Sequence, residues 1–181
     1  MYEWEDKEEM AAWFGQCTGS TVVTVEFKDE FVQEHWDMLT ARAHAGEPLG
    51  DLYPRLELIL QGARNPDLLK AEFNFNKFRC WGLFDLFDEM KPKITPYTFP
   101  VPYDSHMKYK YLLSLDGNGA AWLRLPWILY SNSLLLKQDS ENVQWFYGGL
   151  KKNVNFLPIK SDISDTIDVI EYARENEEEV L

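Results

Sequence analysis

The sequence from Asp116 to Arg124 has the residue types of a loop that can hold an anion. Two of its glycines lie two positions apart, and glycine adopts backbone angles that other residues avoid. Small residues follow, so the backbone can approach a phosphate closely and present its N–H groups. Arg124 adds a guanidinium, whose planar fork of donors suits phosphate oxygens. The candidate binding residues of this loop are Gly117, Asn118, Gly119, Ala120, Ala121 and Arg124.

The segments on either side of this loop predict the elements that position it. The apolar run 109–115 is bounded by turn residues and is short enough to be a buried strand. Pro126 suits the first turn of a helix, which leaves 117–125 as a loop, and 134–136 predicts the next strand. A strand, loop, helix and strand in this order form a parallel crossover unit, whose ligands bind at the carboxyl ends of the strands.

The upstream part of the chain predicts further strands and helices. Residues 10–14 indicate a short strand, and the run 21–27 is also strand-like. In residues 29–43 apolar side chains recur at helical spacing, which predicts a helix with one buried face. Arg55 precedes an amphipathic pattern, so spacing alone is compatible with a solvent-exposed arginine before a helix.

The rest of the chain also predicts strands and helices, separated by a linker. Alternating phenylalanines between residues 73 and 78 indicate a strand or a strand edge, whereas four prolines in 91–103 predict a surface linker. Apolar residues at helical spacing predict a helix over 141–152, and 154–159 predicts a third strand. Ser164 is the expected N-cap of a last helix with a buried isoleucine stripe.

Composition and charge narrow the class of protein. A chain of 181 residues, 45% of them hydrophobic, can bury a core and is expected to form one domain. The net charge of -12 argues against binding to nucleic acid or to an anionic membrane surface. No apolar run reaches the ~18 residues of a membrane span, and the acidic N-terminus is unlike a signal peptide. The glutamate run 177–179 is expected to be a solvated surface.

Cysteines, histidines and aspartates give no sign of a metal site. Cys17 and Cys80 allow at most one internal bridge, and free thiols are expected, with a disulfide as the alternative. The three histidines are too scattered for a zinc signature. Asp85 and Asp88 come nearest to an aspartate pair for a divalent cation, but they lie among apolar residues. We therefore expect neither a metal nor a cofactor.

Several blocks of sequence resemble one family in the same order. They are HMKYKY from His106, LSLDGNGAAWLRLPW, SNSLLLKQDS and WFYGGLKKNVNFLPIKSDISD. Together they are similar to glycosyltransferase family 90, which includes protein O-glucosyltransferases and capsule-associated xylosyltransferases with CAP10-like domains, some of them lipopolysaccharide-modifying. The resemblance runs from about Trp4 to Glu178 with one poorly matched gap. It implies an α/β fold with a Rossmann-like parallel sheet and flanking helices, similar to the C-terminal lobe of a GT-B glycosyltransferase.

The resemblance also assigns roles to particular residues. Residues 13–19 match the block with which the family contacts its donor, although Phe14 stands where the family carries arginine. Arg55 matches an arginine that touches the nucleotide diphosphate, and the family often has serine near Ala121. The chain is then one partial domain, 1–181, in which 26–51 is an insertion relative to the family.

The function that the resemblance implies is transfer of a sugar from a UDP-sugar to a hydroxyl of a protein or polysaccharide. In the family the general base is an aspartate upstream of the block at Trp13, so this chain is expected to be the donor-binding half without its catalytic residue. Family members often reside in the ER or Golgi lumen. Two alternatives stay open: a non-catalytic nucleotide-sugar binding or interaction module, and a small α/β domain without a ligand.

Overall fold

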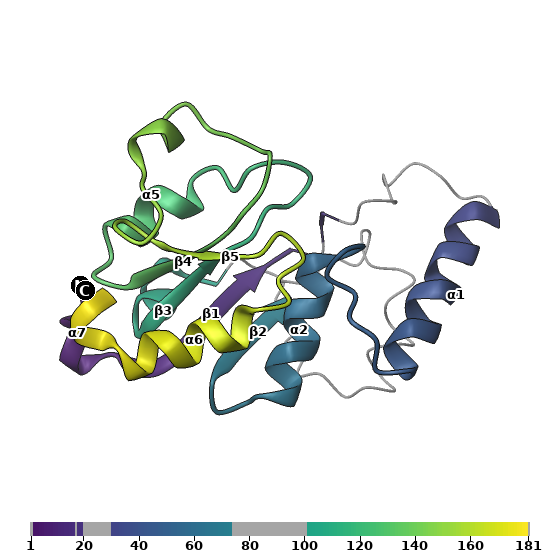
Figure 1. Ribbon diagram of the computed structural model, residues 1–181, viewed down its shortest axis with the longest axis horizontal. Helices are drawn as coiled ribbons and strands as arrows, with labels where there is room; N and C mark the ends of the chain where they lie inside the picture. Colours follow the sequence, from purple (N-terminus) through teal and green to yellow (C-terminus); the bar gives the residue numbers. More distant parts are fainter. Residues whose placement is uncertain (1, 17, 20–29, 74–100, 181) are drawn as a thin grey trace.

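The computed structural model describes residues 2–16, 18–19, 30–73 and 101–180. At its centre is a five-stranded sheet in the order β2-β1-β3-β4-β5, and every neighbouring pair is parallel (Figure 1). The strands are β1 (Glu8–Gly15), β2 (Leu69–Phe73), β3 (Tyr109–Ser114), β4 (Leu134–Gln138) and β5 (Leu157–Ile159). The α/β, Rossmann-like parallel sheet expected from the sequence is therefore confirmed.

Helices connect and cover these strands. The α-helices are α1 (Glu30–His44), α2 (Pro54–Arg64), α4 (Tyr103–Met107), α5 (Arg124–Leu129), α6 (Thr166–Glu175) and α7 (Glu177–Val180). Two 3₁₀ turns, η1 (Trp4–Asp6) and η3 (Tyr147–Gly149), complete the described elements. Within the described residues, no helix is long and apolar enough to cross a bilayer.

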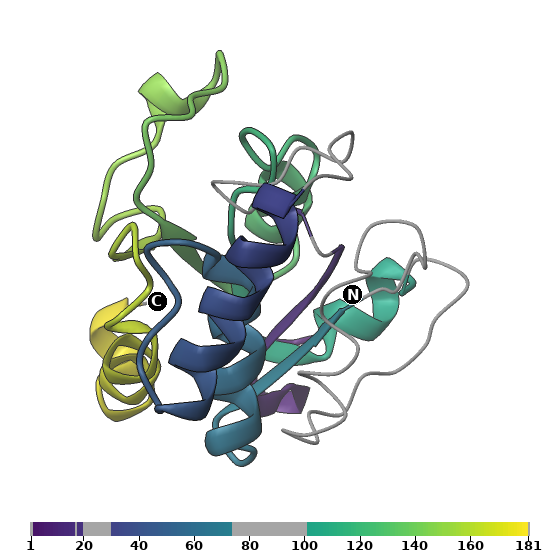
Figure 2. The ribbon, with the colours of Figure 1, turned by 90° about the vertical axis from the view of Figure 1, so that its right-hand side faces the viewer.

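Alternation along the central strands divides the core between the two faces of the sheet. Side chains such as Trp13 and Tyr111 pack with α2 and α6, whereas Ala12 and Leu112 pack with α5 on the opposite face. Figure 2 shows the yellow α6 and the teal α4 on opposite sides of the strands. Both faces are thus covered, as is usual for parallel sheets.

Several sequence predictions are confirmed in position and type. The strands expected at 10–14, 109–115 and 134–136 are β1, β3 and β4, and the helix expected at 29–43 is α1. The strands β3, β4 and β5 are adjacent and parallel. Pro126 lies in the first turn of α5, but this helix begins at Arg124, so the loop predicted over 117–125 is two residues too long.

The helix predicted over 141–152 is wrong. Only the short turn η3 forms there: Phe146, Tyr147 and Leu150 pack against the core, but they do so without forming a helix, and Val143 is exposed. Ser140 and Asn142 instead donate to the Asp116 carboxylate, which holds the start of the segment against the loop after β3. The strand expected over 154–159 forms only in its last three residues, as β5.

Two predictions about the C-terminal region also need correction. Asp165, not Ser164, is the N-cap of α6, and the Ser164 N–H donates to Asp162. The Glu177 carboxylate is not merely solvated: it accepts hydrogen bonds from Trp4 Nε1 (3.3 Å), Tyr111 Oη (3.2 Å) and Lys110 Nζ (2.6 Å). Because these donors lie far away in sequence, no local pattern predicts them.

Other expectations concern residues outside the described ranges. These are the strand-like run 21–27, the alternating phenylalanines beyond Phe73, most of the linker 91–103, and the two cysteines. Tyr103, the last residue of the expected linker, begins α4. The insertion predicted at 26–51 stays a prediction.

Candidate functional site

The strand order of the sheet reverses at one point, between β1 and β3. From β1 the chain moves outward to β2 on one side, and from β3 it moves outward to β4 and β5 on the other. In open parallel sheets a ligand crevice forms at such a switch point, beside the carboxyl ends of the two strands. Here those ends lead into residues 15–19 and 115–121.

A pocket of about 710 Å³ opens at this switch point. Its size falls within the usual range for small-molecule sites. All seven candidate residues from the sequence line it, namely Arg55, Gly117, Asn118, Gly119, Ala120, Ala121 and Arg124. Sequence reasoning did not assign the other lining residues Gln16, Val101, Tyr103, His106, Trp122 and Trp127 to a pocket.

Arg55 ties together the two loops that follow β1 and β3. Its Nε donates to the Asp116 carbonyl at 2.9 Å, and Nη2 donates to the Leu115 carbonyl at 3.1 Å. Its Nη1 donates to the Gln16 carbonyl at 2.9 Å and to Thr18 Oγ1 at 2.6 Å. The side chain is therefore a buried clamp, which excludes the solvent-exposed arginine that spacing alone allowed. Burial lowers the pKa of Arg55 to about 10.

Gly117 is required by this clamp. A Cβ atom at this position would lie 2.8 Å from both Arg55 Nη2 and Thr18 Oγ1, closer than real Cβ contacts. At Gly119, by contrast, an added Cβ would meet nothing within 4 Å. Of the two glycines that break the sequence pattern, only Gly117 is thus required by close packing.

Arg124 places a second guanidinium beside the first. It is the first residue of α5, and its Nη2 donates to the Phe14 carbonyl at 2.6 Å. The guanidinium carbons of Arg55 and Arg124 lie 5.4 and 5.6 Å from the centre of the Trp13 ring. Burial, together with the charge of Arg55, lowers the pKa of Arg124 to about 9. Among the described residues, neither arginine forms an ion pair with a carboxylate.

The glycine loop keeps part of its backbone available. The Gly117 N–H donates to the Gly119 carbonyl at 3.0 Å, and the Ala121 N–H donates to Asp116 Oδ1 at 3.3 Å. Within the described part of the chain, the N–H groups of Asn118, Gly119 and Ala120 have no such acceptor. Three backbone donors and two guanidiniums therefore surround one pocket, which is an arrangement suited to an anion.

Phe14 does not supply the charge that an arginine would bring at this position. Its ring is buried and packs edge-on against the His106 ring, with the ring centres 4.8 Å apart. Its carbonyl, however, positions Arg124. The residue therefore contributes an apolar wall and one backbone acceptor to the pocket.

Acidic groups lie outside the pocket. None of its described lining residues is Asp or Glu. Asp116 is adjacent, but its carboxylate accepts from Ala121, Ser140 and Asn142, which fixes the loop. Among the described residues, no group of three His, Cys, Asp or Glu side chains could hold a metal ion.

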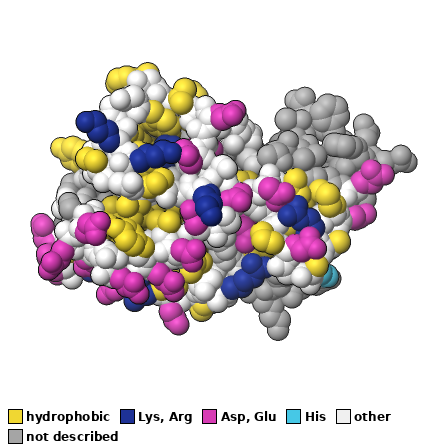
Figure 3. Space-filling model, in the orientation of Figure 1, with side chains coloured by type: hydrophobic (Ala, Val, Ile, Leu, Met, Phe, Trp, Pro, Cys, Tyr) yellow, Lys and Arg dark blue, Asp and Glu magenta, His cyan; other side chains and the backbone are white. Residues whose placement is uncertain are grey.

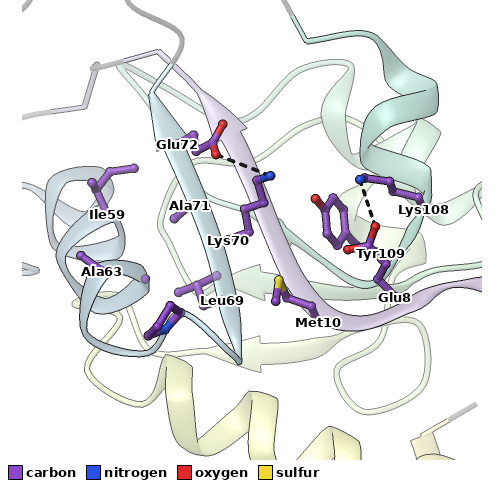
Figure 4. Close-up of a pocket in the computed structure, with 12 residues that line it drawn as sticks. Glu8, Met10, Ile59, Ala63, Leu69, Lys70, Ala71, Glu72, Lys108 and Tyr109 are labelled. Atoms are coloured by element: carbon purple, nitrogen blue, oxygen red, sulfur yellow. Dashed lines mark ion pairs between the residues drawn. The ribbon is translucent and has the colours of Figure 1, made fainter. Parts of the chain in front are cut away.

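A second pocket, of about 400 Å³, lies along β1 and β2 (Figure 4). Its two lysines face carboxylates: Lys108 is 2.9 Å from Glu8, and Lys70 is 3.6 Å from Glu72. Because its cations are already paired and it has no glycine loop, this pocket is less suited to an anion than the first.

Comparisons with known proteins give the family to which this chain belongs. The family model described as Glycosyl transferase family 90 matches residues 21–181. Protein O-glucosyltransferase 3 of Mus musculus is 32% identical over 136 residues, which cover 69% of this chain and 23% of that protein. Protein O-glucosyltransferase 2 of Danio rerio is 32% identical over 125 residues, with the same two coverages. Protein O-glucosyltransferase 1 of Rattus norvegicus is 31% identical over 122 residues, which cover 67% of this chain and 29% of that protein.

The chain thus spans less than a third of the length of these relatives. The family match nevertheless extends over most of its residues, including both arginines and the glycine loop. The protein is accordingly a member of glycosyltransferase family 90.

Proposed function

We propose that the switch-point pocket binds the diphosphate of a UDP-sugar. The chain is then the donor-binding part of a glycosyltransferase that moves a sugar, such as glucose or xylose, to a hydroxyl of a protein or polysaccharide. The relatives named protein O-glucosyltransferase support this activity by family membership. The UDP-sugar is the donor substrate, and the proposal includes no additional cofactor.

The single observation that carries the proposal is the pair of guanidiniums without a carboxylate. Asp and Glu side chains gather on the acidic face near α6 and α7 (Figure 3), yet none lines the pocket that holds Arg55 and Arg124. Burial lowers the pKa values of both arginines, and the charge of the neighbouring Asp116 offsets this only in part at Arg55. A bound diphosphate would supply the missing negative charge and accept hydrogen bonds from the free loop amides.

Titration of three ligands tests this proposal. Calorimetry with UDP, UMP and uridine should give affinity in that order, because each phosphate adds charge-assisted hydrogen bonds of roughly 1.5–3 kcal/mol. UDP should therefore bind at least about 10-fold more tightly than uridine. No binding of UDP, or equal affinity for UDP and uridine, would contradict a diphosphate site.

The 181-residue chain by itself should transfer little or no sugar from UDP-glucose or UDP-xylose. A positioned general base contributes typically about 10² to 10⁴ in rate, and the described pocket lining offers no carboxylate for that role. His106 is a poor base, because burial and the charge of Arg124 lower its pKa to about 4. A coupled assay for released UDP checks this expectation. Robust turnover would place a general base within this chain.

The second candidate function is a non-catalytic nucleotide-sugar module. The carboxylate-free lining favours it, since such a module needs donors for the phosphates but no base. It predicts UDP binding without transfer even when the chain is joined to the upstream part of an O-glucosyltransferase relative. Transfer restored by that fusion would exclude the module.

A further inference from the structure

One side of the pocket is a continuous wall of aromatic rings from β1, α4 and α5. The rings belong to Phe14, Tyr103, His106 and Trp127, and we call them the aromatic wall. The centres of neighbouring rings lie 4.8 Å apart for Phe14 and His106, and 5.2 Å apart for His106 and Trp127. Tyr103 and Trp127 follow at 5.1 Å.

The inner part of this wall is fixed and its outer part is open. Phe14 and His106 are 6% and 5% exposed, and they meet edge to face. Tyr103, at the start of α4, is 55% exposed. An aromatic ring that is anchored on one side and open on the other can accept a second flat ring.

The wall adjoins the proposed diphosphate site. Phe14 belongs to both, because its carbonyl holds the Arg124 guanidinium while its ring begins the wall. Tyr103 and His106 are close enough to Arg124 to interact electrostatically with its charge. The pocket thus joins a cationic end to an aromatic end, which matches a ligand with a phosphate end and a ring end.

We propose that the aromatic wall is the subsite for the six-membered ring that the diphosphate carries, either uracil or the sugar. This inference rests on the proposed function, since it requires the diphosphate to lie at the two arginines. The wall fits either ring, because a planar base stacks on an aromatic face and a sugar presents its apolar C–H face to the same surface. Burial keeps the His106 imidazole neutral at physiological pH, so the wall remains uncharged.

Tyr103→Ala is the most direct test, because the side chain is exposed and its loss should not unfold the protein. The variant and the parent chain are titrated with pyrophosphate, UDP and UDP-glucose. Loss of a stacked ring should weaken binding by roughly 5- to 100-fold. Tyr103→Phe, which keeps the ring, should recover most of that loss. Tyr130→Ala is the matched control, since Tyr130 is 79% exposed just after α5 and does not line the pocket.

The three ligands separate the possible outcomes. Weaker UDP with unchanged pyrophosphate places uracil on the wall, and weaker UDP-glucose with unchanged UDP places the sugar there. Either result supports the inference. If Tyr103→Ala binds all three ligands as the parent does, or weakens pyrophosphate equally, the wall is not a ring subsite. If the parent binds neither UDP nor UDP-glucose, the proposed function itself fails and the inference falls with it.

Discussion

Arg55→Ala should lower the free energy of unfolding by about 2–4 kcal/mol, because it would leave one buried and two partly buried carbonyls without donors, at roughly 1–3 kcal/mol for the buried one. Four of the five N–H donors of Arg55 are used, three of them by main-chain carbonyls. Those carbonyls belong to Gln16, Leu115 and Asp116, in loops that no strand pairing fixes. Urea unfolding followed by tryptophan fluorescence measures the loss.

Two further variants separate the clamp from a simple effect of charge. Arg55→Lys keeps the charge but not the planar fork, so it should lose most of the same stability. Arg174→Ala removes a partly exposed ion pair with Glu9, at 3.1 Å, and should change stability by less than about 1 kcal/mol. If Arg55→Ala unfolds at the same urea concentration as the parent, the clamp does not hold the loops.

The sheet could be predicted because its strands carry strong local signals. The run 109–115 is apolar, ends at a glycine turn and becomes β3, and Pro126 marks the first turn of α5. Burial on both faces makes such strands continuous apolar runs, which are easy to recognise when turn residues bound them. The parallel order then follows from the crossover connections.

Segments whose structure depends on distant partners could not be predicted. Residues 141–152 have helical spacing, but Ser140 and Asn142 donate to the Asp116 carboxylate, and Phe146 and Leu150 reach the core without forming a helix. Glu177 reads as part of a charge run, yet Trp4, Lys110 and Tyr111 donate to it across the fold. In both cases a tertiary contact overrides the local pattern.

The candidate site likewise contains residues that the sequence predicts and residues that it does not. Six of its seven predicted residues follow β3 in the chain, and Arg55 reaches them from α2 through hydrogen bonds to the Leu115 and Asp116 carbonyls. The clamp role of Arg55 and the pocket position of Tyr103 were not predictable. Arg55 reaches backbone carbonyls up to 61 residues away, and Tyr103 follows a proline-rich stretch that has no chemical signature.

Arg124→Ala should weaken UDP binding strongly and change the stability of the protein little, whereas Arg55→Ala is expected to reduce stability. Among the described residues, its guanidinium donates to one acceptor, the Phe14 carbonyl, so most of its donors remain for a ligand. Its lowered pKa means that folding disfavours the charge, so its removal costs little stability. Loss of a charge-assisted hydrogen bond to the diphosphate should weaken UDP binding by about 10- to 100-fold.

Calorimetric titration of UDP into the parent chain, Arg124→Ala and Lys151→Ala tests the central claim most directly. Lys151 is an exposed cation outside the pocket lining, so it controls for the change in net charge. The parent and Lys151→Ala should bind UDP with equal affinity, whereas Arg124→Ala should bind about 10- to 100-fold more weakly. Equal affinities for all three proteins, or no binding of UDP by the parent, would contradict a donor site at the ends of β1 and β3.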